Sequence, residues 1–226
     1  MKIVSDFKLK LNKKNIIETV QSYCQTPQYE ELSKMYDDLF PYLINNSTPL
    51  GMYKIDRKPT ELKINSLKEC SSIVYCLVTI GDESCKKVES LFAEGKFFEA
   101  ILLDTMASSY LFHVSSDLFD KICLDSHELG LGLTCKIAPG DGEIDLEYQK
   151  EIVDIFRNDD IHSIRVVNDC MLYPAKSMSY IYGADSELAY NNKDHSCEDC
   201  NNVFCKMRNI NFKSQKPIFE DKEDCA

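Results

Sequence analysis

Long apolar runs are missing from the 226-residue sequence: no stretch approaches the roughly 18 consecutive apolar residues of a membrane-spanning helix. Residues 1–14 also lack the apolar core of a signal peptide, so we expect a cytoplasmic protein with no membrane partner. Positive charge is scarce as well, since 26 Lys and Arg against 37 Asp and Glu give a net charge of −11. Non-specific binding to nucleic acid depends on Lys and Arg that neutralise phosphates, so we expect no nucleic-acid partner either.

The sequence patterns of several enzyme classes are absent too. The chain contains no His-x-x-x-His pair for a hydrolytic zinc site, no Gly-x-Ser-x-Gly serine nucleophile and no Gly-x-x-x-x-Gly-Lys phosphate loop. Gly130 and Gly132 lack the remaining spacing of a dinucleotide-binding fingerprint. We therefore assign no residue a catalytic role, and the sequence leaves open whether the chain is an enzyme.

What the sequence does contain is an ordinary globular composition, with 44% hydrophobic and 28% charged residues, which can bury a core. Periodicity and turn residues predict strands over 3–11, 51–55, 71–80, 131–138, 164–167 and 178–182, and helices over 12–24, 29–44, 83–94, 97–119 and 146–156. The last two strands are expected to form a hairpin. Because strands and helices mix without strict alternation, we predict a single α+β domain over residues 1–210 and a polar tail over 211–226.

Cysteine is unusually frequent, with 11 in the chain. Cys197, Cys200 and Cys205 form the tightest group, and thiolates at this spacing can bind one soft metal ion. Because the expected compartment is reducing, metal or cluster ligation is favoured over disulfides. Zinc and iron–sulfur sites take four ligands, so a fourth must come from elsewhere; three free thiols are the alternative. The candidates for the fourth ligand are Cys135, Cys170, His195 and Cys225.

Two further segments carry turn chemistry. Pro139-Gly140 forces a turn in the segment 136–142, where glycine lets backbone N–H groups approach a ligand closely. The plainer interpretation of this segment is a turn alone. Tyr173-Pro174 kinks the segment 168–179 between two predicted strands. Taken alone, neither segment indicates a particular ligand.

Taken together and in this order, the segments resemble the reactivation (activation) domain of cobalamin-dependent methionine synthase, and most of all its short stand-alone relatives in anaerobic bacteria. Segments 77–104, 138–149 and 170–179 are similar to the family's strand with two helices, its Pro-Gly loop and its hairpin. The short relatives also tend to close with a Cys-x-x-Cys…Cys segment and a nearby Arg, as the three cysteines and Arg208 do here. The likeness covers roughly residues 71–208.

The resemblance implies a twisted, mostly antiparallel sheet with flanking helices. In that family the domain binds S-adenosylmethionine beside the corrinoid and serves the reductive reactivation of cobalamin. The S-adenosylmethionine site that the resemblance implies consists of Lys136, Ala138, Pro139, Gly140 and Tyr182. Cobalamin would be reached through a partner, either a corrinoid protein or a methionine synthase that lacks its own activation domain. The resemblance also favours an iron–sulfur cluster, with zinc as the alternative, at the three cysteines.

The sequence departs from the family pattern where the ligand is held. The family's loop reads Arg-x-x-Pro-Gly-Tyr, but Lys136 and Asp141 occupy its first and last positions here. A lysine is a point charge and cannot form the bidentate pair with a carboxylate that arginine forms. Two glutamates of the family correspond to Phe112 and Asn168. These changes count against S-adenosylmethionine binding.

We therefore expect an accessory protein of a corrinoid-dependent methyltransferase system, which docks on the corrinoid protein and assists reductive reactivation. One alternative is a non-enzymatic protein-binding module that kept the fold and lost the cofactor site. The other is a metal or redox sensor built on the three cysteines.

Overall fold

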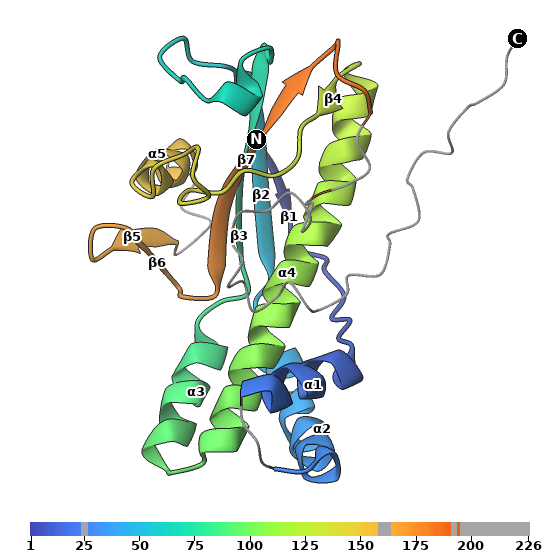
Figure 1. Ribbon diagram of the computed structural model, residues 1–226, viewed down its shortest axis with the longest axis vertical. Coiled ribbons are helices and arrows are strands. Elements are labelled where there is room, and N and C mark those ends of the chain that lie inside the picture. Colours follow the sequence, from blue (N-terminus) through green and yellow to red (C-terminus); the bar gives the residue numbers. More distant parts are fainter. Residues whose placement is uncertain (24–26, 158–163, 191–193, 195–226) are drawn as a thin grey trace, which may run out of the picture.

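A five-stranded sheet in the order β1-β2-β3-β7-β4 forms the centre of the molecule, and all neighbouring strands run antiparallel (Figure 1). The computed structural model describes residues 1–23, 27–157, 164–190 and 194. The strands of the sheet are β1 (Lys2–Val4), β2 (Leu50–Arg57), β3 (Ser72–Thr79), β4 (Gly132–Leu133) and β7 (Ser177–Asp185). A separate hairpin pairs β5 (Arg165–Val167) with β6 (Met171–Tyr173). The predicted α+β fold with an antiparallel sheet is confirmed.

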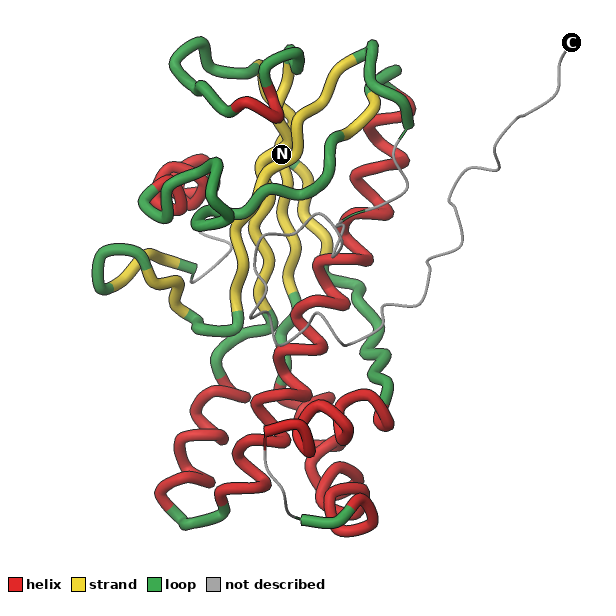
Figure 2. The backbone as a smooth tube through the Cα atoms, viewed as in Figure 1, coloured by secondary structure: helices red, strands yellow, loops and turns green. Residues whose placement is uncertain are grey.

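Helices cover both faces of the sheet and extend past one of its ends. They are α1 (Lys13–Tyr23), α2 (Tyr29–Asn46), α3 (Glu83–Ala93), α4 (Phe97–Glu128), α5 (Tyr148–Ile155) and a 3-10 turn at Asn65–Leu67. Figure 1 shows α4 crossing one face, with α1, α2 and α3 gathered around its N-terminal half. Figure 2 shows the same helical end set apart from the strands. Within the described residues, no helix is both long and apolar enough to cross a membrane.

The core has two halves because the central strand β3 is buried on both faces, as its nearly continuous apolar run predicts. Val74, Cys76 and Val78 pack into the half that contains α4. The alternate residues, including Ile73 and Tyr75, pack into the half that contains α5. Successive side chains of a strand point to opposite faces, so β3 belongs to both halves. The sheet therefore separates an α4 side from an α5 side.

Local sequence signals place several helix ends. Asn12 accepts a hydrogen bond from the backbone N–H of Asn15 at 3.1 Å and so caps α1. Gly95 has a φ of 75° between α3 and α4, a conformation that glycine adopts without strain. These two ends agree with the predicted ones. Helix α4 continues to Glu128, past the predicted end at 119, because both of its halves are packed into the core.

The predicted strand over 3–11 is largely wrong, because β1 ends at Val4. Val4 pairs with Gly51, and β2 begins at Leu50, so the residues beyond Val4 have no backbone partner in the sheet. Phe7 and Leu9 instead pack as partly buried side chains against the α4 side of the core. The alternation of apolar and polar residues in this segment therefore reflects contact with the core and not pairing within the sheet.

The predicted hairpin between 164–167 and 178–182 is also wrong. Strand β5 pairs with β6, whereas β7 lies between β3 and β4. Every residue of β7 except Met178 is buried, which suits a strand inside a sheet better than one in an isolated hairpin. The predicted strand over 131–138 is reduced to β4 and a single bridge from Ile137 to Ile181. The polar tail predicted over 211–226 lies outside the described residues.

Candidate functional site

Lys136 lies on the segment that follows β4 and runs beside β7. Ile137 and Ile181 exchange backbone hydrogen bonds of 3.0 and 2.9 Å, and both side chains belong to the α5 side of the core. Neighbouring side chains of an extended segment point to opposite faces. The Lys136 side chain therefore enters the α4 side, where it meets Ser115 of α4.

Five polar side chains meet at this point, and we call them the Lys136 cluster: Ser115, Lys136, Tyr180, Tyr182 and Asp194. The Lys136 ammonium donates to Ser115 Oγ and to Asp194 Oδ2, each at 2.7 Å. It also lies 4.5 Å from the centroid of the Tyr180 ring, within the range of a cation–π contact. Ser115 Oγ donates to the Tyr180 hydroxyl at 3.0 Å. The cluster thus joins β7, α4 and the segment after β4.

Asp194 is held through both of its carboxylate oxygens and through its backbone. Its Oδ2 faces Lys136, while its Oδ1 accepts a hydrogen bond from the Tyr182 hydroxyl. The backbone N–H of Lys136 donates to the Asp194 carbonyl at 2.9 Å. Burial, and then the Asp194 charge, raise the pKa of Tyr182, so this phenol remains a hydrogen-bond donor at neutral pH. A lysine and a tyrosine together therefore bind one carboxylate.

The Lys136–Asp194 pair is largely withdrawn from water, because the two side chains are only 12% and 14% exposed. A charge pair in such a place stabilises the fold by less than its Coulomb attraction, since both ions have lost their hydration. Removing one partner lowers the stability of the fold by more than the pair contributes to it, because the other charge then stays buried without compensation. Any ligand that enters this cluster must therefore replace Asp194 with an equivalent anion.

The Pro-Gly loop binds its own chain. The backbone N–H of Ala138 donates to Asp141 Oδ2 at 3.2 Å, and that of Gly140 donates to the carbonyl of Ile144 at 2.8 Å. Pro139 has no N–H to donate. Gly140 has a φ of 91°, which explains the glycine as a turn requirement. The structure thus brings Lys136 and Tyr182 together around Asp194, while the loop amides of the predicted site are satisfied locally.

Comparisons with known proteins bear on the fold. The sequence matches no protein-family model and no curated protein. Among solved structures it is similar to the MetH reactivation domain bound to AdoHcy, with a TM-score of 0.54 over 79% of this chain and 77% of that chain. The chain has the fold of the MetH reactivation domain. At 12% identity the likeness extends to the fold alone, which confirms the predicted resemblance at that level.

In this MetH-type fold, the connection from β6 to β7 binds neighbouring helices. The Tyr173 hydroxyl donates to Asp82 Oδ2 at 2.6 Å, just before α3. The Lys176 ammonium lies 2.7 Å from Asp104 Oδ1 and 2.8 Å from Ser108 Oγ, both on α4. The hairpin motif found in the sequence therefore fixes the end of β6 near the start of α3, and the chain just before β7 against α4.

A half-buried carboxyl group on α4, Asp120, was not singled out by the sequence. Its Oδ1 atom is buried and accepts no hydrogen bond within the described part of the chain. Burial, and then the charges of Asp117 and Asp194, raise the pKa of Asp120 to about 6, against the opposing charge of Lys10. Asp120 thus adds negative potential close to the Lys136 cluster.

Sequence reasoning also missed Ser115, Tyr180 and Asp194. A signal for Tyr180 was present, because residues two apart in a strand share a face and Tyr182 belongs to the site that the resemblance implies. Nothing in the sequence around Asp194 marks it as the partner of a lysine 58 positions earlier. That contact depends on where the chain returns after β7.

The predicted metal ligands Cys197, Cys200 and Cys205 lie outside the described residues. Of the candidates for a fourth ligand, Cys135 is exposed and Cys170 is half-buried, while His195 and Cys225 also lie outside. Within residues 1–23, 27–157, 164–190 and 194, no group of three or more His, Cys, Asp or Glu side chains could hold a metal ion. The metal site remains a prediction from the sequence.

Proposed function

We propose that this protein is an accessory module of a methionine synthase-type, corrinoid-dependent methyltransferase system. It would dock on a corrinoid protein, or on a methionine synthase that lacks its own activation domain, and assist the reductive reactivation of cobalamin. The observation that supports this proposal is the MetH reactivation-domain fold over 79% of the chain. In this role the cysteines at 197, 200 and 205, whose spacing resembles that expected for short stand-alone relatives, would carry an iron–sulfur cluster or zinc.

The proposed docking can be tested with a purified cobalamin-bearing module of methionine synthase. We expect the chain to bind the module in the cob(II)alamin state, and an isolated MetH reactivation domain to compete for the same surface. Biolayer interferometry with the immobilised module would measure both effects. Absence of binding in every cobalamin oxidation state, or binding that the reactivation domain does not displace, would refute the docking role.

The residues present do not fit S-adenosylmethionine or AdoHcy in the described conformation. Both ligands carry an amino-acid carboxylate, and the Lys136 ammonium and Tyr182 hydroxyl are suited to hold one. Asp194 already occupies these donors, and the N–H groups of Ala138 and Gly140 are bonded within the loop. We therefore propose that docking does not require this ligand and that Asp194 closes its carboxylate position.

Titration with AdoHcy tests, independently of docking, whether Asp194 blocks the carboxylate position of this ligand. We expect no heat from the wild type at millimolar AdoHcy and measurable binding by the Asp194→Asn variant, which keeps a hydrogen-bond acceptor for Tyr182 and removes the competing charge. Adding Lys136→Met to that variant should abolish the binding. Wild-type binding that Asp194→Asn leaves unchanged would show that Asp194 does not occlude the ligand.

A second candidate function is a protein-binding module that kept the fold and lost the cofactor site. The filled donors of the Lys136 cluster favour this alternative. The two functions differ in their partner, because the second predicts stable docking on a protein without cobalamin. Binding that stays unchanged when cobalamin is removed from the partner would favour the protein-binding module.

A further inference from the structure

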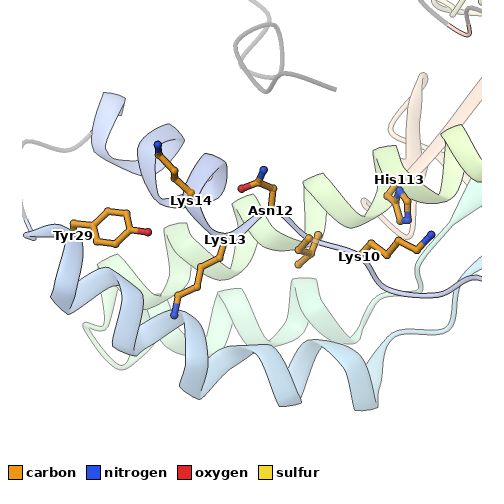
Figure 3. Close-up of a pocket in the computed structure, with 7 residues that line it drawn as sticks. Lys10, Asn12, Lys13, Lys14, Tyr29 and His113 are labelled. Atoms are coloured by element: carbon orange, nitrogen blue, oxygen red, sulfur yellow. The ribbon is translucent and has the colours of Figure 1, made fainter. Parts of the chain in front are cut away.

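A short basic segment contrasts with the acidity of the whole chain. Residues 8–14 contain four lysines and no Asp or Glu, although the net charge of the protein is −11. This segment leads into α1 and, with the start of α2 and the middle of α4, borders a shallow and largely open depression of about 680 Å³, which we call the groove (Figure 3). Its polar lining residues are Lys10, Asn12, Lys13, Lys14, Tyr29 and His113. No carboxylate from the described residues lines the groove.

The lysines of the groove differ in how far their charge is already neutralised. Lys13 forms a 2.7 Å ion pair with Asp37, so its charge is compensated within the protein. The Lys14 ammonium lies 3.7 Å from Glu18, and its side chain is 72% exposed. Lys10 forms no ion pair with the described residues. Lys10 and Lys14 therefore supply the positive charge that is available to a ligand.

His113 contributes a nitrogen that lacks a partner. Its Nε2 atom is buried and forms no hydrogen bond with the described residues, although Asp117 Oδ2 lies 3.6 Å away on the same helix. Burial lowers the pKa of His113, Asp117 opposes this shift and Lys10 adds to it, so the imidazole is neutral at neutral pH. A bound anion nearby would favour the imidazolium form, whose second N–H faces Asp117.

We propose that this groove binds polyvalent oxyanions of the phosphate class. Figure 3 shows Lys10 and His113 at one end of the groove and Lys14 with Tyr29 at the other, with Asn12 between them. Cationic groups at two separated positions suit a ligand with more than one anionic group. The first-turn N–H groups of α1, apart from that of Asn15, which Asn12 already accepts, lie at the same place and favour negative charge there. None of these residues belongs to the Lys136 cluster, so the proposal does not depend on the proposed corrinoid role.

Inorganic tripolyphosphate is a suitable probe, with inorganic phosphate, which has a single phosphate group, as its comparison. Calorimetric titration at an ionic strength of about 0.15 M screens charges that lie more than roughly 8 Å from the bound anion, so the measured affinity reports on nearby charges. The double variant Lys10→Gln/Lys14→Gln removes the available charge. The matched control Lys63→Gln/Lys68→Gln removes two exposed lysines from the connection between β2 and β3, so both proteins have the same net charge.

We expect wild-type protein and the control to bind tripolyphosphate with affinities within about twofold, and the groove variant to bind at least about tenfold more weakly. Inorganic phosphate should bind more weakly than tripolyphosphate. In the wild type, NMR should show the His113 ring resonances shifting on addition of tripolyphosphate, a signal that does not depend on the stability of any variant.

Three results would overturn the proposal. The first is the absence of tripolyphosphate binding at millimolar concentration with unshifted His113 resonances. The second is an equal loss of affinity in the groove variant and the control, which would indicate net charge alone. The third is that a polyglutamate peptide binds through Lys10 and Lys14 while tripolyphosphate does not, which would assign the groove to an acidic protein surface.

Discussion

Replacing Asp120 by asparagine tests whether the fold holds a carboxyl group in an unfavourable place. In the folded protein the pKa of Asp120 is raised to about 6, first by burial and then by Asp117 and Asp194. In the unfolded chain an aspartate titrates near 3.9. Between these values the folded protein keeps a proton that the unfolded chain has released. The free energy of unfolding therefore falls as the pH rises through this window.

The size of the effect follows from the two pKa values. A carboxyl group that titrates at about 6 when folded and near 3.9 when unfolded reduces the free energy of unfolding by about 1.4 kcal/mol between pH 5 and pH 8. Because Asp120 is partly accessible to water, we reduce this figure to about 1 kcal/mol. Asparagine does not titrate, so the Asp120→Asn variant should gain about 1 kcal/mol relative to wild type over the same range.

Urea unfolding followed by circular dichroism at pH 5, 6, 7 and 8 and constant ionic strength would measure this difference. The Asp38→Asn variant, which removes an exposed carboxylate from α2, is the matched control and should parallel wild type. The free energy of unfolding of Asp120→Asn could instead follow that of wild type at all four pH values. The carboxyl group would then be well solvated in the folded protein. The assigned burial of Asp120 would then be wrong.

Three further predictions concern stability and metal content. Lys136→Met should lower the free energy of unfolding by about 3 kcal/mol, because it leaves the Asp194 carboxylate nearly buried and unpaired; a loss below about 1 kcal/mol in urea unfolding would contradict this. Gly132→Ala should destabilise by about 1–3 kcal/mol, because its Cβ would clash with the carbonyl oxygen of Leu188, and an unchanged melting temperature would contradict that packing. Cys200→Ser should remove iron and sulfide, or zinc, from anaerobically purified protein, and unchanged content in elemental analysis would exclude this cysteine as a ligand.

The fold was predictable where local patterns and tertiary packing agree. The apolar run that became β3 is buried on both faces, and the stripe that became α2 begins and ends within two residues of its expected limits. The predicted secondary structure was wrong where tertiary packing alone determined the path of the chain. Residues 5–11 alternate like a strand, but β2 offers no backbone beyond Leu50 to pair with them.

The candidate site was predictable only in part. The turn at Pro139-Gly140 follows from backbone preference. Lys136 and Tyr182 entered the predicted site through the family resemblance, although the family has arginine at the position of Lys136. The interpretation of the loop amides as ligand donors did not anticipate Asp141, whose side chain accepts from the loop itself. A side chain that can satisfy a neighbouring donor competes with any ligand, and sequence spacing does not reveal the geometry of that contact.

The sequence by itself determined the mixture of helices and strands, the doubly buried central strand and the glycine turns, because these depend on side-chain periodicity and local backbone preference. Only the tertiary structure decided that β7 lies beside β3, and that Asp194 meets a lysine 58 positions earlier in the chain. Such contacts join segments distant in the sequence, and they form only after the core has fixed where each segment returns. The pairing of Asp194 with Lys136 and Tyr182 is therefore a property of the fold and not of any motif.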